Sequence, residues 1–112
     1  MANIRMSPLA VADLQEIKAY IADELSNPAA ANRIVGRIIN DYSRLADAPH
    51  LGPSLSSVVP VETDYRFLVS GKYIVFYQTD SEMVSIYRIL YGSRDYMKVL
   101  FGNRLTDDEE IE

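Results

Sequence analysis

The chain has no cysteine, and only one of its 112 residues is a histidine. Without cysteine it can form neither a disulfide nor a metal site built on thiolates, which agrees with a reducing compartment. The single histidine, His50, and the scattered carboxylates lack the ligand spacing of a structural metal site. His50 follows Pro49 in a loop, where a lone imidazole is more often solvated than catalytic. We therefore predict no metal site and no catalytic histidine.

Long apolar runs and targeting signals are also absent. A membrane-spanning helix needs about 20 predominantly apolar residues in a row, and no run in this chain approaches that length. Residues 1–6 contain no basic region followed by an apolar stretch, which is the pattern of a secretory signal. Glycine-rich phosphate loops and nucleophile elbows are missing as well. These absences predict a cytoplasmic protein that does not associate with a membrane.

The apolar content is sufficient for one small domain. Hydrophobic residues make up 48% of the sequence, which is ordinary for a globular protein and too high for a disordered one. We predict a single domain at residues 1–102, followed by an acidic and disordered tail at 103–112. We interpret this tail as a solubilising end in preference to an autoinhibitory one.

The net charge of −5 is unevenly distributed along the chain. Residues 1–65 hold 5 basic and 8 acidic side chains, whereas residues 66–104 hold 6 basic and 3 acidic ones. The other five carboxylates all lie within residues 105–112. The acidic balance of the whole chain argues against general adhesion to nucleic acid, which needs several basic contacts. The mildly basic segment 66–104 leaves a phosphate-bearing partner open.

Two helices are predicted in the first half of the chain. Ser7-Pro8 and Asn27-Pro28 each place an N-cap residue before a proline at the first helical position. Apolar residues recur at steps of three and four over residues 8–25 and 28–46, so each helix has one apolar stripe. Because the break between the helices is short, they form an antiparallel hairpin.

Three strands are predicted after the helices. Residues 65–70, 72–79 and 84–91 are rich in aromatic and β-branched side chains, and short turns join them into an antiparallel meander. Residues 4–6 form a further short strand. The loop at 48–64 is long for a compact domain, so it is either a functional excursion or a partly ordered strap. The predicted fold class is α+β, with a two-helix antiparallel hairpin packed on a small antiparallel β-sheet.

Four tyrosines on the last two strands are candidates for target binding. Strand alternation places Tyr73 and Tyr77 on one face of the middle strand, and Tyr87 and Tyr91 on one face of the last. If the two faces coincide, four phenol rings line one side of the sheet. Such a side is either a contact surface for bases or for a protein, or simply the cover of the less buried face, and we favour the cover.

Two arginines near the end of the sheet segment have distinct predicted roles. Arg94 follows the last strand and can project from the rim of the sheet. There it either clamps a phosphate or carboxylate, or pairs with Asp95 or a helix carboxylate. Arg88 lies in mid-strand beside apolar residues, where a buried guanidinium needs a carboxylate partner. We interpret Arg88 as structural.

The order of these elements and several motifs resemble the RelE/ParE superfamily of bacterial toxin–antitoxin toxins. The resemblance covers about residues 4–101, and its last motif is the most specific one. The motifs are SPLAVADLQEIKAYI at 7–21, PHLG at 49–52, YIVFY at 73–77 and RILYGSRD at 88–95. The fold that the resemblance implies, a two-helix hairpin on a small antiparallel sheet, agrees with the pattern above.

The resemblance implies one of two activities. RelE-like members cut messenger RNA on the ribosome with cations and a tyrosine, whereas ParE-like members lack this set and inhibit DNA gyrase through protein contacts. Arg66 and Arg94 match two cations of the nuclease set, and Tyr96 would have to replace its tyrosine. The set is incomplete, because Leu68 and Tyr73 occupy positions where further cations would belong, and Leu100 stands near the expected tyrosine. We therefore favour a ParE-like toxin of a type II toxin–antitoxin, or plasmid stabilisation, system. A RelE-like mRNA endonuclease and a degenerate, non-toxic binding module are the alternatives.

The resemblance also implies partners and no cofactor. A cognate antitoxin would dock on the helix hairpin and an open sheet edge, and the target would be DNA gyrase, or the ribosome with mRNA. A homodimer is left open. The residues predicted to bind the antitoxin are Ile17, Ile21, Val35 and Ile39. Those predicted to bind the target are Tyr73, Tyr77, Tyr87, Tyr91 and Arg94. In the nuclease case alone, the residues predicted for catalysis are Arg66, Arg94 and Tyr96.

Overall fold

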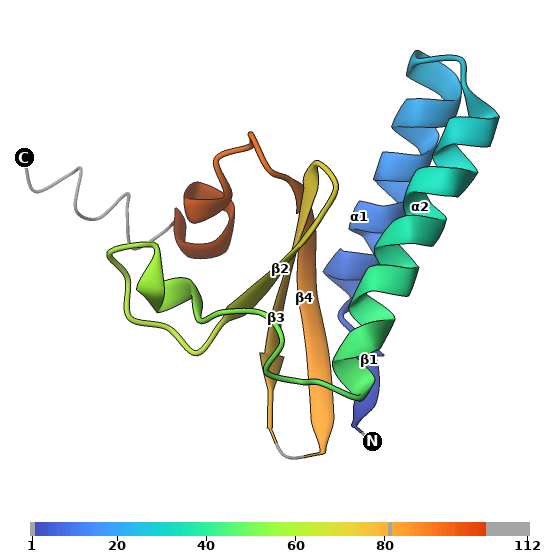
Figure 1. Ribbon diagram of the computed structural model, residues 1–112. Helices are drawn as coiled ribbons and strands as arrows, with labels where there is room; N and C mark the ends of the chain where they lie inside the picture. The colour runs from blue at the N-terminus through green and yellow to red at the C-terminus, as the bar shows by residue number, and fades with distance from the viewer. Residues whose placement is uncertain (1, 81, 103–112) are drawn as a thin grey trace, which may run out of the picture.

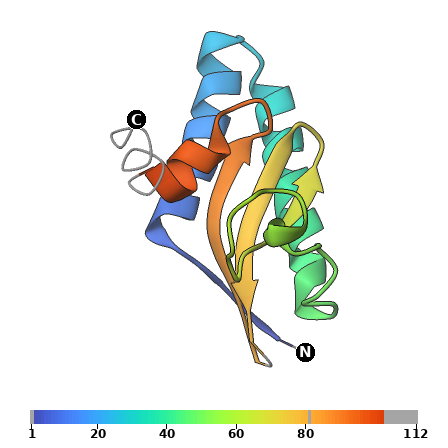
Figure 2. The same cartoon turned by 90° about the vertical axis from the view of Figure 1, so that its left-hand side faces the viewer.

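The structure is a computed structural model that describes residues 2–80 and 82–102, and it shows a sheet covered on both faces (Figure 1). Two helices, α1 (Pro8–Ala19) and α2 (Pro28–Ser43), pack on one face as an antiparallel hairpin. The loop before the sheet and a final helical stretch cover the other face, which Figure 2 turns toward the viewer. The predicted α+β class is confirmed.

Four strands form one sheet in the order β1-β4-β3-β2. Strands β2 (Arg66–Ser70), β3 (Tyr73–Thr79) and β4 (Met83–Tyr91) form the predicted antiparallel meander. The first strand, β1 (Asn3–Met6), pairs with β4 in the parallel direction, so the sheet is mixed where we predicted an antiparallel one. No hairpin turn joins β1 to β4, so nothing in the local sequence specifies the direction of their pairing.

Both helices begin where the cap-and-proline pattern predicts. The side chains of Ser7 and Asn27 each accept a backbone N–H of the first turn, at 3.0 and 3.1 Å. α1 continues into a π-helical turn, η1 (Tyr20–Glu24), and α2 into a 3-10 turn, η2 (Arg44–Ala46). Between the helices Ser26 has a φ of 51°, a left-handed conformation that reverses the chain. None of the described helices has the length and apolar character needed to cross a membrane.

Two apolar clusters attach the covering layers to the sheet. The cluster under the helix hairpin includes the buried side chains of Ile38, Val75 and Ile89. The cluster on the other face includes Phe76 and extends under the helical stretch at 96–102. Full burial of a large apolar side chain contributes about 1.5–3 kcal/mol, so a few such residues suffice to hold each layer. The tail predicted at 103–112 lies outside the described residues.

Candidate functional site

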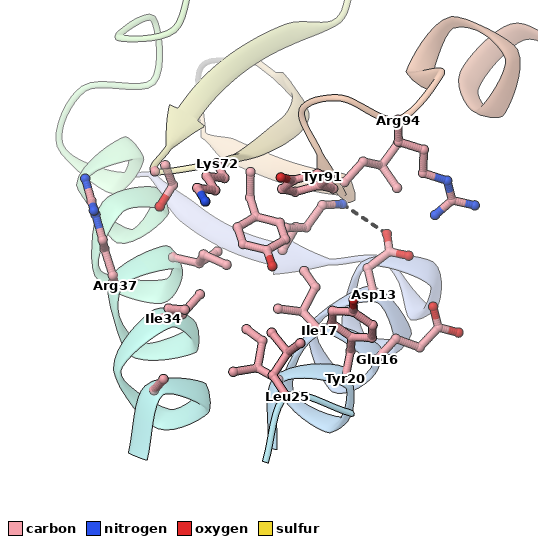
Figure 3. Close-up of a pocket in the computed structure, with 18 of the residues that line it drawn as sticks. Asp13, Glu16, Ile17, Tyr20, Leu25, Ile34, Arg37, Lys72, Tyr91 and Arg94 are labelled. Atoms are coloured by element: carbon pink, nitrogen blue, oxygen red, sulfur yellow. Dashed lines mark hydrogen bonds between the residues drawn. The ribbon is translucent and has the colours of Figure 1, made fainter. Parts of the chain in front are cut away.

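A groove lies between the outer part of the helix hairpin and the end of the sheet (Figure 3). The hairpin extends past the end of the sheet, as Figure 1 shows, so its inner face has no strand to cover there. The groove has a volume of about 740 Å³. Its apolar lining consists of Ile17, Tyr20, Ile21, Leu25, Ala30, Ile34, Ile38, Tyr73, Ile89, Leu90 and Tyr91.

Several apolar side chains of the groove are exposed to solvent. Tyr20 and Leu25 are each 56% exposed, and Tyr91 is 45% exposed. Single exposed apolar residues are common, whereas several that line one concave surface mark a binding site for a protein segment or a ligand. The groove is therefore the candidate functional site.

Charged side chains stand at the rim of the groove. Arg37, Lys72 and Arg94 are exposed cations, and Glu16 is an exposed carboxylate on α1. Arg37 Nε lies 3.7 Å from a carboxylate oxygen of Asp41. Among the described residues the guanidinium of Arg94 has no ion-pair or hydrogen-bond partner. Arg94 thus projects from the rim, and neither of the ion pairs that we considered for it forms within that part of the chain.

A largely buried ion pair lies beside the groove, and Figure 3 shows its carboxylate, Asp13, with a dashed line that marks the hydrogen bond from the N–H of Ile89. The carboxylate of Asp13 on α1 accepts hydrogen bonds from Arg88 Nε at 2.8 Å and Nη2 at 2.9 Å. It also accepts the N–H of Ile89 at 3.0 Å. Because β1 pairs with β4 only as far as Ile86, this N–H has no strand partner on that side. The hydrogen bonds to Asp13 raise the pKa of Arg88, which therefore keeps its charge. Arg88 has the carboxylate partner that we predicted, and the pair holds α1 against β4.

Two tyrosines of the predicted target-binding set meet in the groove. Tyr73 and Tyr91 are paired across β3 and β4, with ring centroids 5.6 Å apart in an edge-on arrangement. Burial raises the pKa of Tyr73, and the neighbouring phenols of Tyr91 and Tyr20 raise it further. The phenol of Tyr73 therefore stays uncharged near neutral pH, and the two rings give the groove an aromatic surface.

The other two tyrosines lie outside the groove, so the condition that we set for a line of four phenols, that the two faces coincide, is not met. The register of β3 with β4 shifts between Phe76 and Tyr77, which leaves Tyr87 as an extra residue on β4. Such a β-bulge changes the alternation of side chains by one residue. Tyr87 therefore lies on the face away from the helices, stacked on Tyr65 with ring centroids 5.3 Å apart.

Tyr77 is fully buried and holds the long loop against the sheet. Its hydroxyl accepts the N–H of Gly52 and donates to the carbonyl of Pro49, both at 2.9 Å. Arg66 donates to the carbonyl of Gly52 at 2.6 Å. Burial raises the pKa of Tyr77, and the Gly52 N–H and the charge of Arg66 partly offset this effect. The loop at 48–64 is therefore held against the sheet at Pro49 and Gly52, and we call it the strap.

We expect Tyr77→Phe to lower the free energy of unfolding by about 1–3 kcal/mol, because the buried N–H of Gly52 loses its acceptor while the ring stays in place. Urea unfolding measures the loss, and hydrogen exchange at the Gly52 amide should become faster. Tyr91→Phe is the matched control, since Tyr91 is 45% exposed and its hydroxyl has no hydrogen-bond partner among the residues that the structure describes. Its loss should change stability by less than about 0.5 kcal/mol. Equal losses in the two variants would contradict the role assigned to the Tyr77 hydroxyl.

The three residues predicted for RNA cleavage lie in different places. Arg66 pairs with Tyr77, four residues along β3 from Tyr73, or about 13 Å from the level of the groove. Its guanidinium is bound to the strap. Tyr96 packs into the apolar cluster on the face away from the helices. Of the three, only Arg94 lines the groove, and the structure does not bring them around one site.

The residues predicted for antitoxin binding divide into two pairs. Ile17 and Ile21 line the groove, the first half-buried and the second only 4% exposed. Val35 and Ile39 lie on α2 outside the groove, and Ile39 is 40% exposed. A contact of either pair with an antitoxin stays a prediction.

The sequence patterns did not single out Tyr20, Arg37 or Lys72 as members of one site. One signal pointed toward such a site. The apolar stripe of the first helix continues to Leu25, next to the turn between the helices. A stripe that reaches the tip of a helix hairpin can extend beyond the sheet, and its last residues then remain available to a partner.

Solved structures with the same arrangement define the class of this protein. The chain is similar to the structure of a chromosomal ParDE toxin–antitoxin system from P. aeruginosa, with a TM-score of 0.68 and 22% identity over 81% of this chain and 96% of that one. It is also similar to the toxin–antitoxin complex RelBE2 from Mycobacterium tuberculosis, with a TM-score of 0.59 and 18% identity over 80% and 96%. YafQ from E. coli strain BL21(DE3) gives 0.54 and 14% over 90% and 99%. The fold is that of the RelE/ParE superfamily of toxins.

The family within this superfamily follows from the sequence. The family model of the ParE toxin of the type II toxin–antitoxin system parDE matches residues 4–96. The chain belongs to the ParE toxin family. No curated protein sequence gives a significant match. The predicted membership of the superfamily, with the ParE-like branch favoured, is confirmed.

Proposed function

We propose that this toxin inhibits growth by binding a protein target, DNA gyrase, and that a cognate antitoxin neutralises it by occupying the groove. The observation that carries the proposal is the groove itself, with Tyr20, Leu25 and Tyr91 exposed inside it and cations at its rim. A surface of this kind recognises another polypeptide, because apolar anchors supply affinity and the rim charges select the partner.

The chemistry of the groove specifies the kind of antitoxin segment that fits. An amphipathic helix can insert its apolar side chains between the hairpin and the end of the sheet. Carboxylates on its polar face would meet Arg37, Lys72 and Arg94. The ParDE and RelBE2 structures are of toxin–antitoxin systems, which supports a cognate antitoxin as the partner.

A protein target is favoured over RNA cleavage because the side chains predicted for catalysis are separated. Cleavage at a phosphate needs proton transfer and charge stabilisation around the same atoms. Arg66 is bound to the strap and Tyr96 is packed in an apolar cluster, so neither is positioned to act beside Arg94. Contact with a protein requires no such convergence.

Supercoiling by DNA gyrase in the presence of the purified toxin tests the proposal. We expect supercoiling to be inhibited, and addition of the cognate antitoxin to restore it. If supercoiling is unaffected while translated messages are cut, the nuclease alternative is correct, and Arg66→Ala with Arg94→Ala should abolish the cutting. If neither activity is found and the antitoxin still binds, the chain is a non-toxic binding module.

A further inference from the structure

We infer that the acidic segment at 105–112 of this same chain occupies the groove when no antitoxin is bound. The inference rests on the proposed function in one respect only, that the groove is a site for a polypeptide. It adds an internal competitor to that site, so that an antitoxin must displace a segment of the toxin. This inference replaces our interpretation of the tail as a solubilising end, which the composition of the tail alone had favoured.

The rim charges of the groove are incompletely compensated. Arg37 is 3.7 Å from Asp41 and keeps 67% of its side chain exposed, while neither Lys72 nor Arg94 has an ion pair within the described residues. On the acidic side, Asp13 is neutralised by Arg88, which leaves Glu16 as the one unpaired carboxylate among the lining residues. The local balance of the rim is therefore positive, although the chain carries a net charge of −5.

The segment has the complementary composition. Residues 105–112 contain five carboxylates and no basic side chain. Two apolar side chains accompany the carboxylates: Leu105 precedes them, and Ile111 lies between Glu110 and Glu112. Carboxylates that meet arginine or lysine form charge-assisted hydrogen bonds, and an apolar side chain between them can insert next to Tyr20 and Leu25. Segment and groove thus match in charge and in apolar character.

The path between them is short enough. Arg94 stands at the rim, and the helical stretch at 96–102 starts two residues later and covers about 10 Å. Residues 103–112 can span up to about 33 Å when extended. The chain can therefore return along that helical stretch and cross the turn at 92–95 to the rim. Attachment at this distance gives a local concentration in the millimolar range, so weak contacts are sufficient for occupancy.

A spin label on the segment tests its position. Because the chain has no cysteine, Glu112→Cys supplies one labelling site in the 112-residue chain. We expect the label to broaden the NMR signals of the Ile34, Lys72 and Tyr91 amides several-fold more than those at 96–102. The matched control carries the same label together with Asp107→Asn, Asp108→Asn, Glu109→Gln and Glu110→Gln, and the broadening in the groove should disappear.

Two outcomes would overturn the inference. Broadening that is confined to the neighbours of residues 96–102, or that is unchanged in the neutralised control, would show that the segment stays out of the groove. Dilution of the labelled chain with unlabelled, isotope-free chain distinguishes broadening within one molecule from broadening between two molecules. If the broadening then disappears, the groove is occupied by the segment of another copy.

The affinity for an antitoxin distinguishes this inference from the proposed function. The variant with the four neutralised carboxylates should bind the antitoxin about tenfold more tightly if the segment fills the groove about nine-tenths of the time. An unchanged affinity, with binding mapped to the groove, would contradict the competition. If the antitoxin binds outside the groove, the proposed docking site is wrong. The spin-label experiment then decides the position of the segment by itself.

Discussion

Asp13→Ala is expected to lower the free energy of unfolding by about 3 kcal/mol, because it leaves the largely buried guanidinium of Arg88 without a counter-charge. The Asp13 side chain is 6% exposed and Arg88 15%, so water can replace little of the lost interaction. The N–H of Ile89 loses its acceptor in the same variant. Small domains have a total stability of about 5–15 kcal/mol, so a substantial part of it depends on this one carboxylate.

Urea unfolding of four variants separates the pair from its surroundings. Arg88→Met should cost about as much as Asp13→Ala, while the combination of Asp13→Ala with Arg88→Met should recover part of the loss because no uncompensated charge remains. Arg37→Ala is the matched control. It breaks an exposed pair with Asp41 at 3.7 Å and should cost less than about 0.5 kcal/mol. Additive losses from Asp13 and Arg88 would refute the coupling.

The local elements and one long-range contact could be predicted from the sequence. Ser7 and Asn27 each cap their own first turn, so the starts of both helices could be predicted locally. The hydrogen bond that the Ser7 hydroxyl also donates to the carbonyl of Tyr87 has no such local signal. The partner of Arg88 followed from electrostatics, since a guanidinium among apolar residues needs a carboxylate. The sequence did not indicate which carboxylate it would be, because Asp13 is 75 residues away.

The features that could not be predicted depend on register and on relative length. The bulge opposite Tyr77 moves Tyr87 to the other face, and no glycine or turn residue marks it in the sequence. The parallel pairing of β1 has no local signal either. The groove exists because the hairpin extends past the end of the sheet, and this offset results from how the layers pack. Prediction therefore succeeded for contacts that local chemistry requires and failed for those that the assembly of layers determines.

Tyr20→Asp combined with Leu25→Asp is expected to weaken antitoxin binding by a factor on the order of 10² to 10³. Each change replaces an exposed apolar anchor of the proposed docking groove by a charge, and two such anchors together are worth about 3–4 kcal/mol. Both side chains are 56% exposed, so the fold should keep its stability within about 1 kcal/mol. Calorimetric titration of the variant with purified antitoxin measures the loss, and its thermal unfolding checks that the domain is intact.

Two further substitutions by aspartate show whether the loss of antitoxin binding is specific to the groove. Val58→Asp is the matched control, since Val58 is 60% exposed on the strap and lies outside the groove, and its affinity should equal that of the unmodified toxin. Val69→Asp acts on β2, the edge strand, where Val69 is 59% exposed. A loss at Val69 with none at Tyr20 and Leu25 would mean that the antitoxin adds a strand to this edge instead of entering the groove. The edge and the groove use separate side chains. Losses at both would therefore mean that the antitoxin contacts the hairpin and the sheet edge together. One part of the antitoxin would then insert apolar anchors into the groove, and another part would pair with the backbone of β2.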